Sequence, residues 1–257
     1  MEHKNINRSL MRGLHVLTII GRLQEPTLSN IARESGLAKS TTSRFLNTLL
    51  SEEFLDMDGS YYRLAPKVLE LGFAALRNIG ISESVATPLQ AVADLCLGAS
   101  NLARLDRNGV IIVARRTYQT QKQRFYSMQI DIGTRLPGLF TATGRILLGH
   151  HKPALEQEIV KWREHSNTYS LKKEDAIREA IAEARERNVA TIKNQLAPGF
   201  GAVAIGLKLP SKVWLAFSGS YLLSDHNEDV EDKVLVALQE HTDQLYTLIA
   251  ANLEHSH

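Results

Sequence analysis

Residues 28–51, LSNIARESGLAKSTTSRFLNTLLS, constrain the fold more than any other stretch of the sequence. Their apolar residues are spaced for two short helices. Gly36 stands between them, where a tight turn needs a positive φ that glycine adopts at little cost. Ala32 is small enough to let the two helices cross closely. The apolar face of the second helix consists of residues three and four positions apart, namely Thr42, Phe45, Leu46 and Leu49. The stretch therefore predicts a helix-turn-helix unit.

The outer face of the second helix is polar and has no acidic side chain. Its Arg and Asn groups can contact base edges, and the free N–H groups at the helix N-terminus suit phosphate. Similar helix pairs are also common in domains that bind no nucleic acid. On its own, the stretch favours DNA binding by only about two to one. The candidate DNA contacts on this face are Lys39, Ser40, Thr41, Ser43, Arg44 and Asn47.

A β-hairpin is predicted directly after the second helix. Two short runs, 54–55 and 61–64, flank Asp58-Gly59, a pair typical of tight hairpin turns. A hairpin in this place is the wing of a winged helix-turn-helix, with Arg63 near the DNA backbone. The alternative is a hairpin that only covers the core. Before the unit, residues 9–23 predict a packing helix with Ser9 as its N-cap and Arg12 as a further phosphate contact.

The net charge of the chain gives mixed support for a nucleic-acid partner. It is only +2 for the whole sequence, whereas nucleic-acid binders are usually more basic. Residues 1–78 contain ten Lys and Arg against eight Asp and Glu, so this part is no more basic than the whole. Residues 37–50, however, contain Lys39 and Arg44 and no acid. Charge therefore favours DNA contact locally but not globally.

Length and composition exclude several classes of protein. A chain of 257 residues exceeds one small core, so two domains are expected, and 44% hydrophobic residues argue against wholesale disorder. The single cysteine, Cys96, stands in an apolar run, which excludes a disulfide framework and predicts a buried thiol. No apolar run reaches transmembrane length, and residues 1–8 lack the apolar core of a signal peptide. We expect a soluble cytoplasmic protein that does not contact a membrane.

The remainder of the chain predicts a second domain with a central antiparallel sheet and flanking helices. Residues 66–79 precede it as an apolar helix, which we expect to be covered by a partner subunit because it is too apolar for water. The expected helices are 84–97, 142–149, 153–164, 172–187 and 230–253, and the expected strands are 101–105, 110–116, 124–130, 189–193, 202–209 and 213–218.

Patterns typical of enzymes are missing from the sequence. It contains no GxSxG, GxGxxG, P-loop, HExxH or CxxC pattern. The nearest nucleophile candidate is Ser218-Gly219-Ser220 at a predicted strand end, and nothing selects a histidine or acid to activate it. His150-His151 is expected at the surface or capping a helix rather than binding metal. We therefore expect no catalytic residue, no metal and no cofactor.

Several segments are similar to one known family. SLMRGLHVL, LSNIARESGLAKSTTSRFLNTLL and YYRLAPKVLELG resemble the amino-terminal domain of IclR-type transcriptional regulators. GTRLP with TATGRILLG, and APGFGAVAIGL with LAFSGS, resemble their effector-binding domain. The resemblance runs from about Ser9 to Leu253. It implies an α+β two-domain fold: a winged helix-turn-helix in residues 1–65, a linker helix in 66–81, and a GAF-like α/β domain with a central antiparallel sheet for effector binding and oligomerisation in 82–257.

The resemblance also implies a function and partners. It implies a homodimer or homotetramer that binds pseudo-palindromic double-stranded DNA and controls a catabolic operon in response to a small carboxylate. The family's recognition positions fall here on Lys39, Ser40, Thr41, Ser43 and Arg44. Its pocket-lining segments fall on residues 136–144, 189–201 and 215–220, and the candidate effector contacts are Leu136, Thr141, Ala142, Thr143, Asn194, Ala202, Ala216 and Ser218.

Departures from the family pattern indicate the class of effector. Members with very small polar effectors carry an acidic pair where this chain has Ile192 and Lys193, and an Arg-Cys pair is replaced by Gly201 and Ala202. The less polar pocket favours a larger, partly aromatic acid. Arg135 or Lys193 is expected to face its carboxylate, although Arg135 is equally a structural loop residue. The expected hydrogen-bond donors are Thr141, Thr143, Asn194 and Ser218.

A rival hypothesis is a small-molecule sensor or enzyme whose helix-turn-helix serves dimerisation only. The nearly neutral net charge is its best support. DNA affinity distinguishes the two, because phosphate contacts release counterions and make binding fall steeply with salt.

Overall fold

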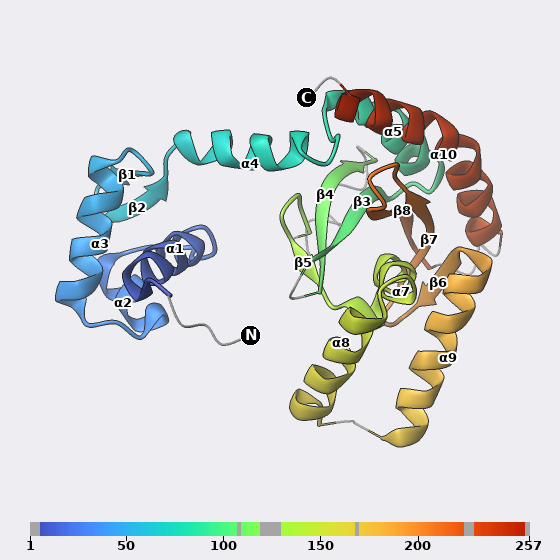
Figure 1. Ribbon diagram of the computed structural model, residues 1–257, viewed down its shortest axis with the longest axis horizontal. Helices are drawn as coiled ribbons and strands as arrows, with labels where there is room; N and C mark the ends of the chain where they lie inside the picture. The colour runs from blue at the N-terminus through green and yellow to red at the C-terminus, as the bar shows by residue number, and fades with distance from the viewer. Residues whose placement is uncertain (1–5, 107–108, 119–129, 168–169, 224–228, 255–257) are drawn as a thin grey trace. The chain divides into compact units, whose positions relative to one another are not determined.

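The computed structural model describes residues 6–106, 109–118, 130–167, 170–223 and 229–254 (Figure 1). The chain divides into two compact units, residues 1–75 and 76–257. Each unit has its own apolar core.

The first unit is a three-helix bundle followed by a hairpin. It contains α1 (Arg8–Ile20), α2 (Leu28–Ser35), α3 (Lys39–Ser51), β1 (Leu55–Asp58) and β2 (Tyr61–Leu64). Its core is formed by Val16, Ile19, Ile20, Ile31, Leu46 and Leu55. Gly36 has φ 65°, as predicted for the turn between the two helices. The predicted N-cap of the first helix was wrong: Asn7, rather than Ser9, accepts the N–H of Leu10.

A solvent-exposed apolar helix follows, α4 (Lys67–Arg77), and the division between the two units falls within it. None of its side chains is buried, and Leu69, Leu71 and Phe73 are each more than half exposed. The sequence predicted this helix. A partner that covers it stays a prediction.

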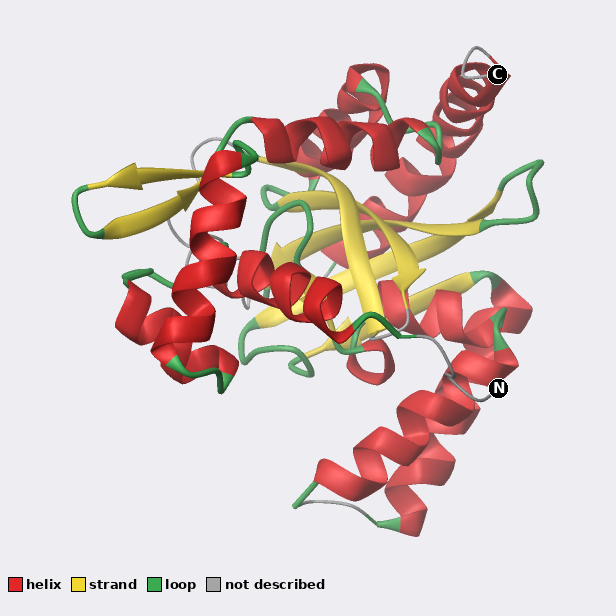
Figure 2. Ribbon diagram, turned by 60° about the vertical axis from the view of Figure 1, so that its left-hand side comes forward, coloured by secondary structure: helices red, strands yellow, loops and turns green. Residues whose placement is uncertain are grey.

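The second unit is built on a six-stranded antiparallel sheet in the order β5-β4-β3-β8-β7-β6. Figure 2 shows the twist of its strands. The strands are β3 (Ala99–Asp106), β4 (Gly109–Thr117), β5 (Arg135–Leu136), β6 (Val189–Lys193), β7 (Phe200–Lys208) and β8 (Trp214–Leu222). The helices are η1 (Glu83–Val85), α5 (Ala86–Leu95), η3 (Gly138–Phe140), α7 (Ala142–Gly149), α8 (Lys152–His165), α9 (Leu171–Arg187) and α10 (Val230–Glu254).

Helices cover both faces of the sheet, as the alternation of buried strand residues requires. On one face α5 and α10 pack over a core that includes Leu102 and Phe217. On the other face α7 packs against β6, β7 and β8, with Ile146 and Ala204 in the interface. The α8–α9 hairpin adds its own cluster around Ile159.

The boundaries of several elements differ from the sequence prediction. β7 begins at Phe200, and β8 continues to Leu222, so Ser218 lies inside a strand rather than at its end. The short strand β5 was not among the predicted strands. The strand predicted at 124–130 lies outside the described residues except for Ile130, which belongs to no strand.

Candidate functional site

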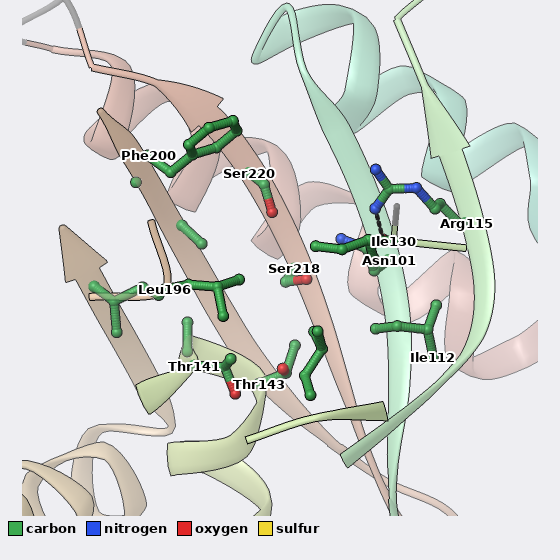
Figure 3. Close-up of a pocket in the computed structure, with 15 residues that line it drawn as sticks. Asn101, Ile112, Arg115, Ile130, Thr141, Thr143, Leu196, Phe200, Ser218 and Ser220 are labelled. Atoms are coloured by element: carbon green, nitrogen blue, oxygen red, sulfur yellow. Dashed lines mark hydrogen bonds between the residues drawn. The ribbon is translucent and has the colours of Figure 1, made fainter. Parts of the chain in front are cut away.

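A cavity opens between the sheet and the N-terminal end of α7 (Figure 3). Its empty space is about 570 Å³, including the part open to solvent. The walls come from all six strands of the sheet, from the start of α7 and from residues in the adjoining connections. The lining residues are Asn101, Ile112, Arg115, Ile130, Leu136, Thr141, Ala142, Thr143, Ile192, Leu196, Phe200, Gly201, Ala202, Ser218 and Ser220.

Strand register brings the lining residues of the sheet together. Asn101 pairs with Ser218 across β3 and β8, and Ala202 pairs with Ser220 across β7 and β8. Ser218 and Ser220 point to the same face because side chains alternate along a strand. The cavity floor is therefore fixed by the pairing of three neighbouring strands.

Tight packing fixes the start of α7 above this floor. The hydroxyl of Thr141 caps the helix by accepting the N–H of Gly144 at 3.1 Å, and it donates to the carbonyl of Pro137 at 3.0 Å. A Cβ on Gly144 would stand 2.0 Å from the carbonyl oxygen of Gly138, so only glycine fits there. This contact places Thr143 over the cavity.

Arg115 is the only charged side chain that lines the cavity within the described part of the chain. It is partly buried, and its Nη1 donates to Oδ1 of Asn101 at 2.6 Å. Burial lowers the pKa of the Arg115 guanidinium from its usual value, and the charge of nearby Asp131 opposes this effect. A guanidinium remains charged at neutral pH even so, and it forms no ion pair with a described residue. The cavity thus presents a positive charge to a bound ligand.

Hydroxyl groups supply the other available polar contacts. Thr143 and Ser218 are almost fully buried, and neither hydroxyl forms a hydrogen bond with a described residue. Figure 3 shows Ser218 and Ser220 on one strand, with Phe200 near Ser220 at one end of the cavity. The remaining walls are largely apolar.

The structure brings together six of the eight predicted effector contacts, Leu136, Thr141, Ala142, Thr143, Ala202 and Ser218. The other two lie elsewhere. Asn194 forms the turn after β6, where its Oδ1 accepts the N–H of Gly199 at 2.7 Å. Ala216 is fully buried in the core beside α7. Thr141 was expected to donate a hydrogen bond to the effector, but its hydroxyl already donates to the carbonyl of Pro137 and caps α7.

Neither residue predicted to face a carboxylate lines the cavity. Arg135 forms an ion pair with Asp106 at 2.8 Å, and Lys193 forms one with Glu231 at 2.6 Å. Sequence reasoning missed Arg115 because a β-bulge interrupts the alternation of β4: Leu102 pairs with Ala114, but the next residue of β3 pairs with Ile112. Strict alternation from Ile112 would turn Arg115 away from the cavity.

The exposed face of α3 carries most of the predicted DNA contacts. Lys39, Ser40, Arg44 and Asn47 are exposed, and Thr41 and Ser43 are partly buried. Ala38 provides no side-chain cap, so the first N–H groups of α3 have no side-chain partner at the cap.

Two further predicted DNA contacts lie outside α3. Arg12 is exposed on α1. Arg63 is exposed on the hairpin, but it forms an ion pair with Asp58 at 2.7 Å, which sequence reasoning did not anticipate. The charge that the wing presents is therefore partly neutralised.

The remaining candidates for chemistry have structural roles. His150 caps α7 and stacks on Trp214 with ring centroids 3.5 Å apart, and His151 caps α8 by accepting the N–H of Ala154. Cys96 is buried, as predicted, which raises the pKa of its thiol to about 12. Among the described residues there is no cluster of metal-ligating side chains, and no helix is both long and apolar enough to cross a membrane.

Comparisons with known proteins agree with this architecture. Residues 9–59 match the model of the IclR helix-turn-helix domain, and residues 73–246 match that of the bacterial transcriptional regulator IclR C-terminal domain. The Pca regulon regulatory protein of Pseudomonas putida is 33% identical over 141 residues, which are 54% of this chain and 47% of that protein. The chain thus aligns with about half the length of that relative.

Two more distant proteins align over nearly the whole chain. The p-hydroxybenzoate hydroxylase transcriptional activator of Acinetobacter baylyi is 24% identical over 254 residues, covering 93% of this chain and 91% of that protein. The crystal structure of an IclR homolog from Microbacterium hydrocarbonoxydans, complexed with 4-hydroxybenzoate, has a TM-score of 0.74 at 19% identity and covers 96% of this chain and 99% of that one. At that identity the likeness concerns the fold. With both domain models matched in order over most of its length, the chain belongs to the IclR family of bacterial transcriptional regulators.

Proposed function

We propose that this chain is a DNA-binding regulator that senses an organic acid, and that an aromatic carboxylate is the class its cavity suits best. The observation that carries the proposal is Arg115, a charged side chain in a cavity with no acidic lining residue among those described. A carboxylate satisfies a guanidinium with charge-assisted hydrogen bonds. Asn101 already holds one side of Arg115, so the group is oriented before a ligand arrives.

The walls of the cavity support a ligand with an apolar body. Ile112, on the same strand as Arg115, and Ile192 and Leu196 on the other side of the cavity line it with aliphatic side chains, and Phe200 adds an aromatic ring (Figure 3). Ser218 and Thr143 lie across the cavity and can bind a ring hydroxyl. A two- or three-carbon acid would cover little of this apolar surface, so it would bind more weakly than an aromatic acid. The name of the Acinetobacter relative, a p-hydroxybenzoate hydroxylase transcriptional activator, and the 4-hydroxybenzoate bound to the Microbacterium homolog support the same class.

Calorimetry with 4-hydroxybenzoate tests this assignment directly. We expect saturable binding that is at least tenfold tighter than the binding of glyoxylate or pyruvate. Replacing Arg115 by Gln should weaken binding by about 1.5–3 kcal/mol, the usual contribution of a hydrogen bond to a charged group. Arg116→Gln is the matched control, because Arg116 is paired with Glu83 and does not line the cavity. Binding of only the small acids, or equal losses in both variants, would refute the aromatic assignment.

The first unit is proposed to bind DNA through α3. Its exposed face combines Lys39 and Arg44 with an N-terminus that has no side-chain cap, an arrangement that suits phosphate oxygens. Two copies of this helix, one from each protomer of a homodimer or homotetramer, would read a pseudo-palindrome. The exposed apolar side chains of α4 support the assembly of more than one copy, because such surfaces are usually covered.

Selection of genomic fragments by the purified protein, at near-physiological salt, tests the DNA-binding part. Enrichment of a few fragments that share an inverted repeat would support a regulator, and the neighbouring genes would identify acids for calorimetry. If no fragment is enriched with or without candidate acids, the alternative of a sensor or enzyme with a helix-turn-helix for dimerisation is favoured.

A further inference from the structure

We call the cavity lined by Arg115 the effector cavity, after its proposed function. A second hollow lies away from it, between the α8–α9 hairpin and the turn after β6. We call it the hairpin groove. It holds about 1320 Å³ of empty space, including open solvent, which leaves room for more than a single ion. Two cations line it, Arg145 and Lys173, and none of its lining residues is acidic. The lining residues are Phe140, Arg145, Trp162, Ser166, Lys173, Ala176, Ile177, Ala180, Asn194 and Gln195.

Arg145 of α7 is the unusual member of this set. Its side chain is 9% exposed, and it has no ion-pair partner in the part of the chain that the structure describes. Nη2 donates to Oε1 of Gln195 at 2.6 Å and Nη1 to the carbonyl of Thr191 at 3.3 Å, whereas Nε is buried with no hydrogen-bond partner. Burial lowers the pKa of Arg145, as expected for a cation held away from water. A buried charge without a counter-ion is costly, so an anion nearby would be favoured.

The acidic residues that share a cavity with Arg145 lie on the side away from the hairpin groove. On that side Arg145 borders a separate cavity whose acidic lining residues are Glu183, Glu231 and Asp232. Glu231 pairs with Lys193 at 2.6 Å and Glu183 with Arg187 at 2.9 Å. The positive charge of Arg145 is thus least compensated on the side of the hairpin groove.

Two arginines of the α8–α9 hairpin differ from Arg145 because both form ion pairs. Arg163 and Arg178 both pair with Glu174, and Arg178 also pairs with Glu156. Lys173 precedes Glu174 but forms no ion pair with any described residue. The hairpin therefore neutralises Arg163 and Arg178 internally, whereas Lys173 lines the groove without a described ion-pair partner.

Apolar side chains line the rest of the groove. Phe140 and Trp162 meet edge to face with ring centroids 6.0 Å apart, and Ile177 belongs to the apolar cluster beside them. Two cations beside an aromatic and aliphatic wall suit a ligand with an anionic head and an apolar body. We propose that the hairpin groove is a second ligand site, which binds an amphipathic organic anion such as a carboxylate or sulfonate on an aromatic or aliphatic body.

The two hollows share structural elements, which gives the second site a consequence for the first. Arg145 holds Gln195, and the next residue, Leu196, lines the effector cavity. Thr143 lines that cavity two residues before Arg145. A ligand that competes with Gln195 for Arg145 would loosen one wall of the effector cavity. This consequence rests on the proposed effector function, whereas binding in the groove does not.

Fluorine NMR of the full-length protein tests groove binding at a single residue. The chain has two tryptophans, so labelling with 5-fluorotryptophan gives one signal from Trp162 in the groove and one from Trp214, which lines neither hollow. A Trp214→Phe variant assigns the signals, and Trp162→Phe assigns them independently if the first variant folds poorly. With 2-naphthoate as the probe, we expect a saturable shift of the Trp162 signal.

Matched variants separate groove binding from other effects. Lys173→Met should weaken the response of Trp162 by about fivefold, whereas Lys172→Met, which removes the same charge one residue earlier outside the groove lining, should leave it unchanged. Arg115→Gln should also leave it unchanged, because that residue lies in the effector cavity. An unsaturable shift, equal effects of the two lysine variants, or loss of the response in Arg115→Gln would each overturn the proposal. Failure of 4-hydroxybenzoate to bind would instead refute only the effector assignment.

Discussion

Arg44 and Arg63 are both exposed arginines of the first unit, and they differ in their partners. Arg63 is paired with Asp58, whereas Arg44 forms no ion pair with any residue that the structure describes. An unpaired guanidinium on α3 is free to form a bidentate contact with a guanine edge or a phosphate. At the residue scale, the charge of Arg44 is therefore more available to DNA than that of Arg63.

Replacing Arg44 by Ala should weaken operator binding by roughly 1–3 kcal/mol. Arg63→Ala should weaken operator binding less than Arg44→Ala does, because Asp58 already neutralises part of the charge of Arg63. Fluorescence anisotropy with a labelled operator fragment measures both, with circular dichroism to show that each variant folds. A near-normal affinity of folded Arg44→Ala would exclude α3 as the recognition helix.

At the scale of elements, α7 is placed by its contact with the segment before it. A Cβ on Gly144 would come within 2.0 Å of the carbonyl oxygen of Gly138, and backbone cannot yield as a flexible side chain does. Any larger residue at position 144 must push α7 and the backbone at residue 138 apart and change the wall of the cavity that Thr143 lines. At Gly72 in α4, by contrast with Gly144, an added Cβ would have no atom within 4 Å.

Gly144→Ala should therefore destabilise the second unit by about 1–3 kcal/mol, the usual cost of overpacking. Gly72→Ala should instead stabilise α4 by about 0.5–1 kcal/mol, because alanine loses less conformational freedom in a helix. Urea unfolding followed by circular dichroism measures both changes. If Gly144→Ala is as stable as the unaltered protein, the close approach of α7 to residue 138 does not fix this wall.

Elements were predicted well from the sequence where periodicity is regular. The bounds of α7 and β6 match the prediction because a helical face and a short buried strand each leave a clear pattern. Six of the eight predicted effector contacts line the cavity. They were predicted because the family resemblance indicated which segments of the chain line the pocket. Arg115 was missed because a bulge, which depends on pairing between distant segments, reverses the alternation of β4. Ion pairs such as Arg135–Asp106 likewise depend on side chains 29 residues apart in sequence.

At the scale of the whole molecule, the near-neutral net charge of +2 is compatible with DNA binding only if the cations are concentrated where DNA lies. Arg12, Lys39 and Arg44 are exposed in the first unit and form no ion pair with a described residue. Three such contacts from each of two protomers would neutralise about six phosphates, which gives a slope of log affinity against log salt near −5. Doubling the salt concentration from 0.1 M should then weaken operator binding by about 40-fold. Anisotropy titrations at several salt concentrations, with the operator and with a scrambled duplex, measure this slope. A helix-turn-helix that serves dimerisation alone would bind both duplexes equally weakly, so equal affinities at every salt concentration would favour that alternative.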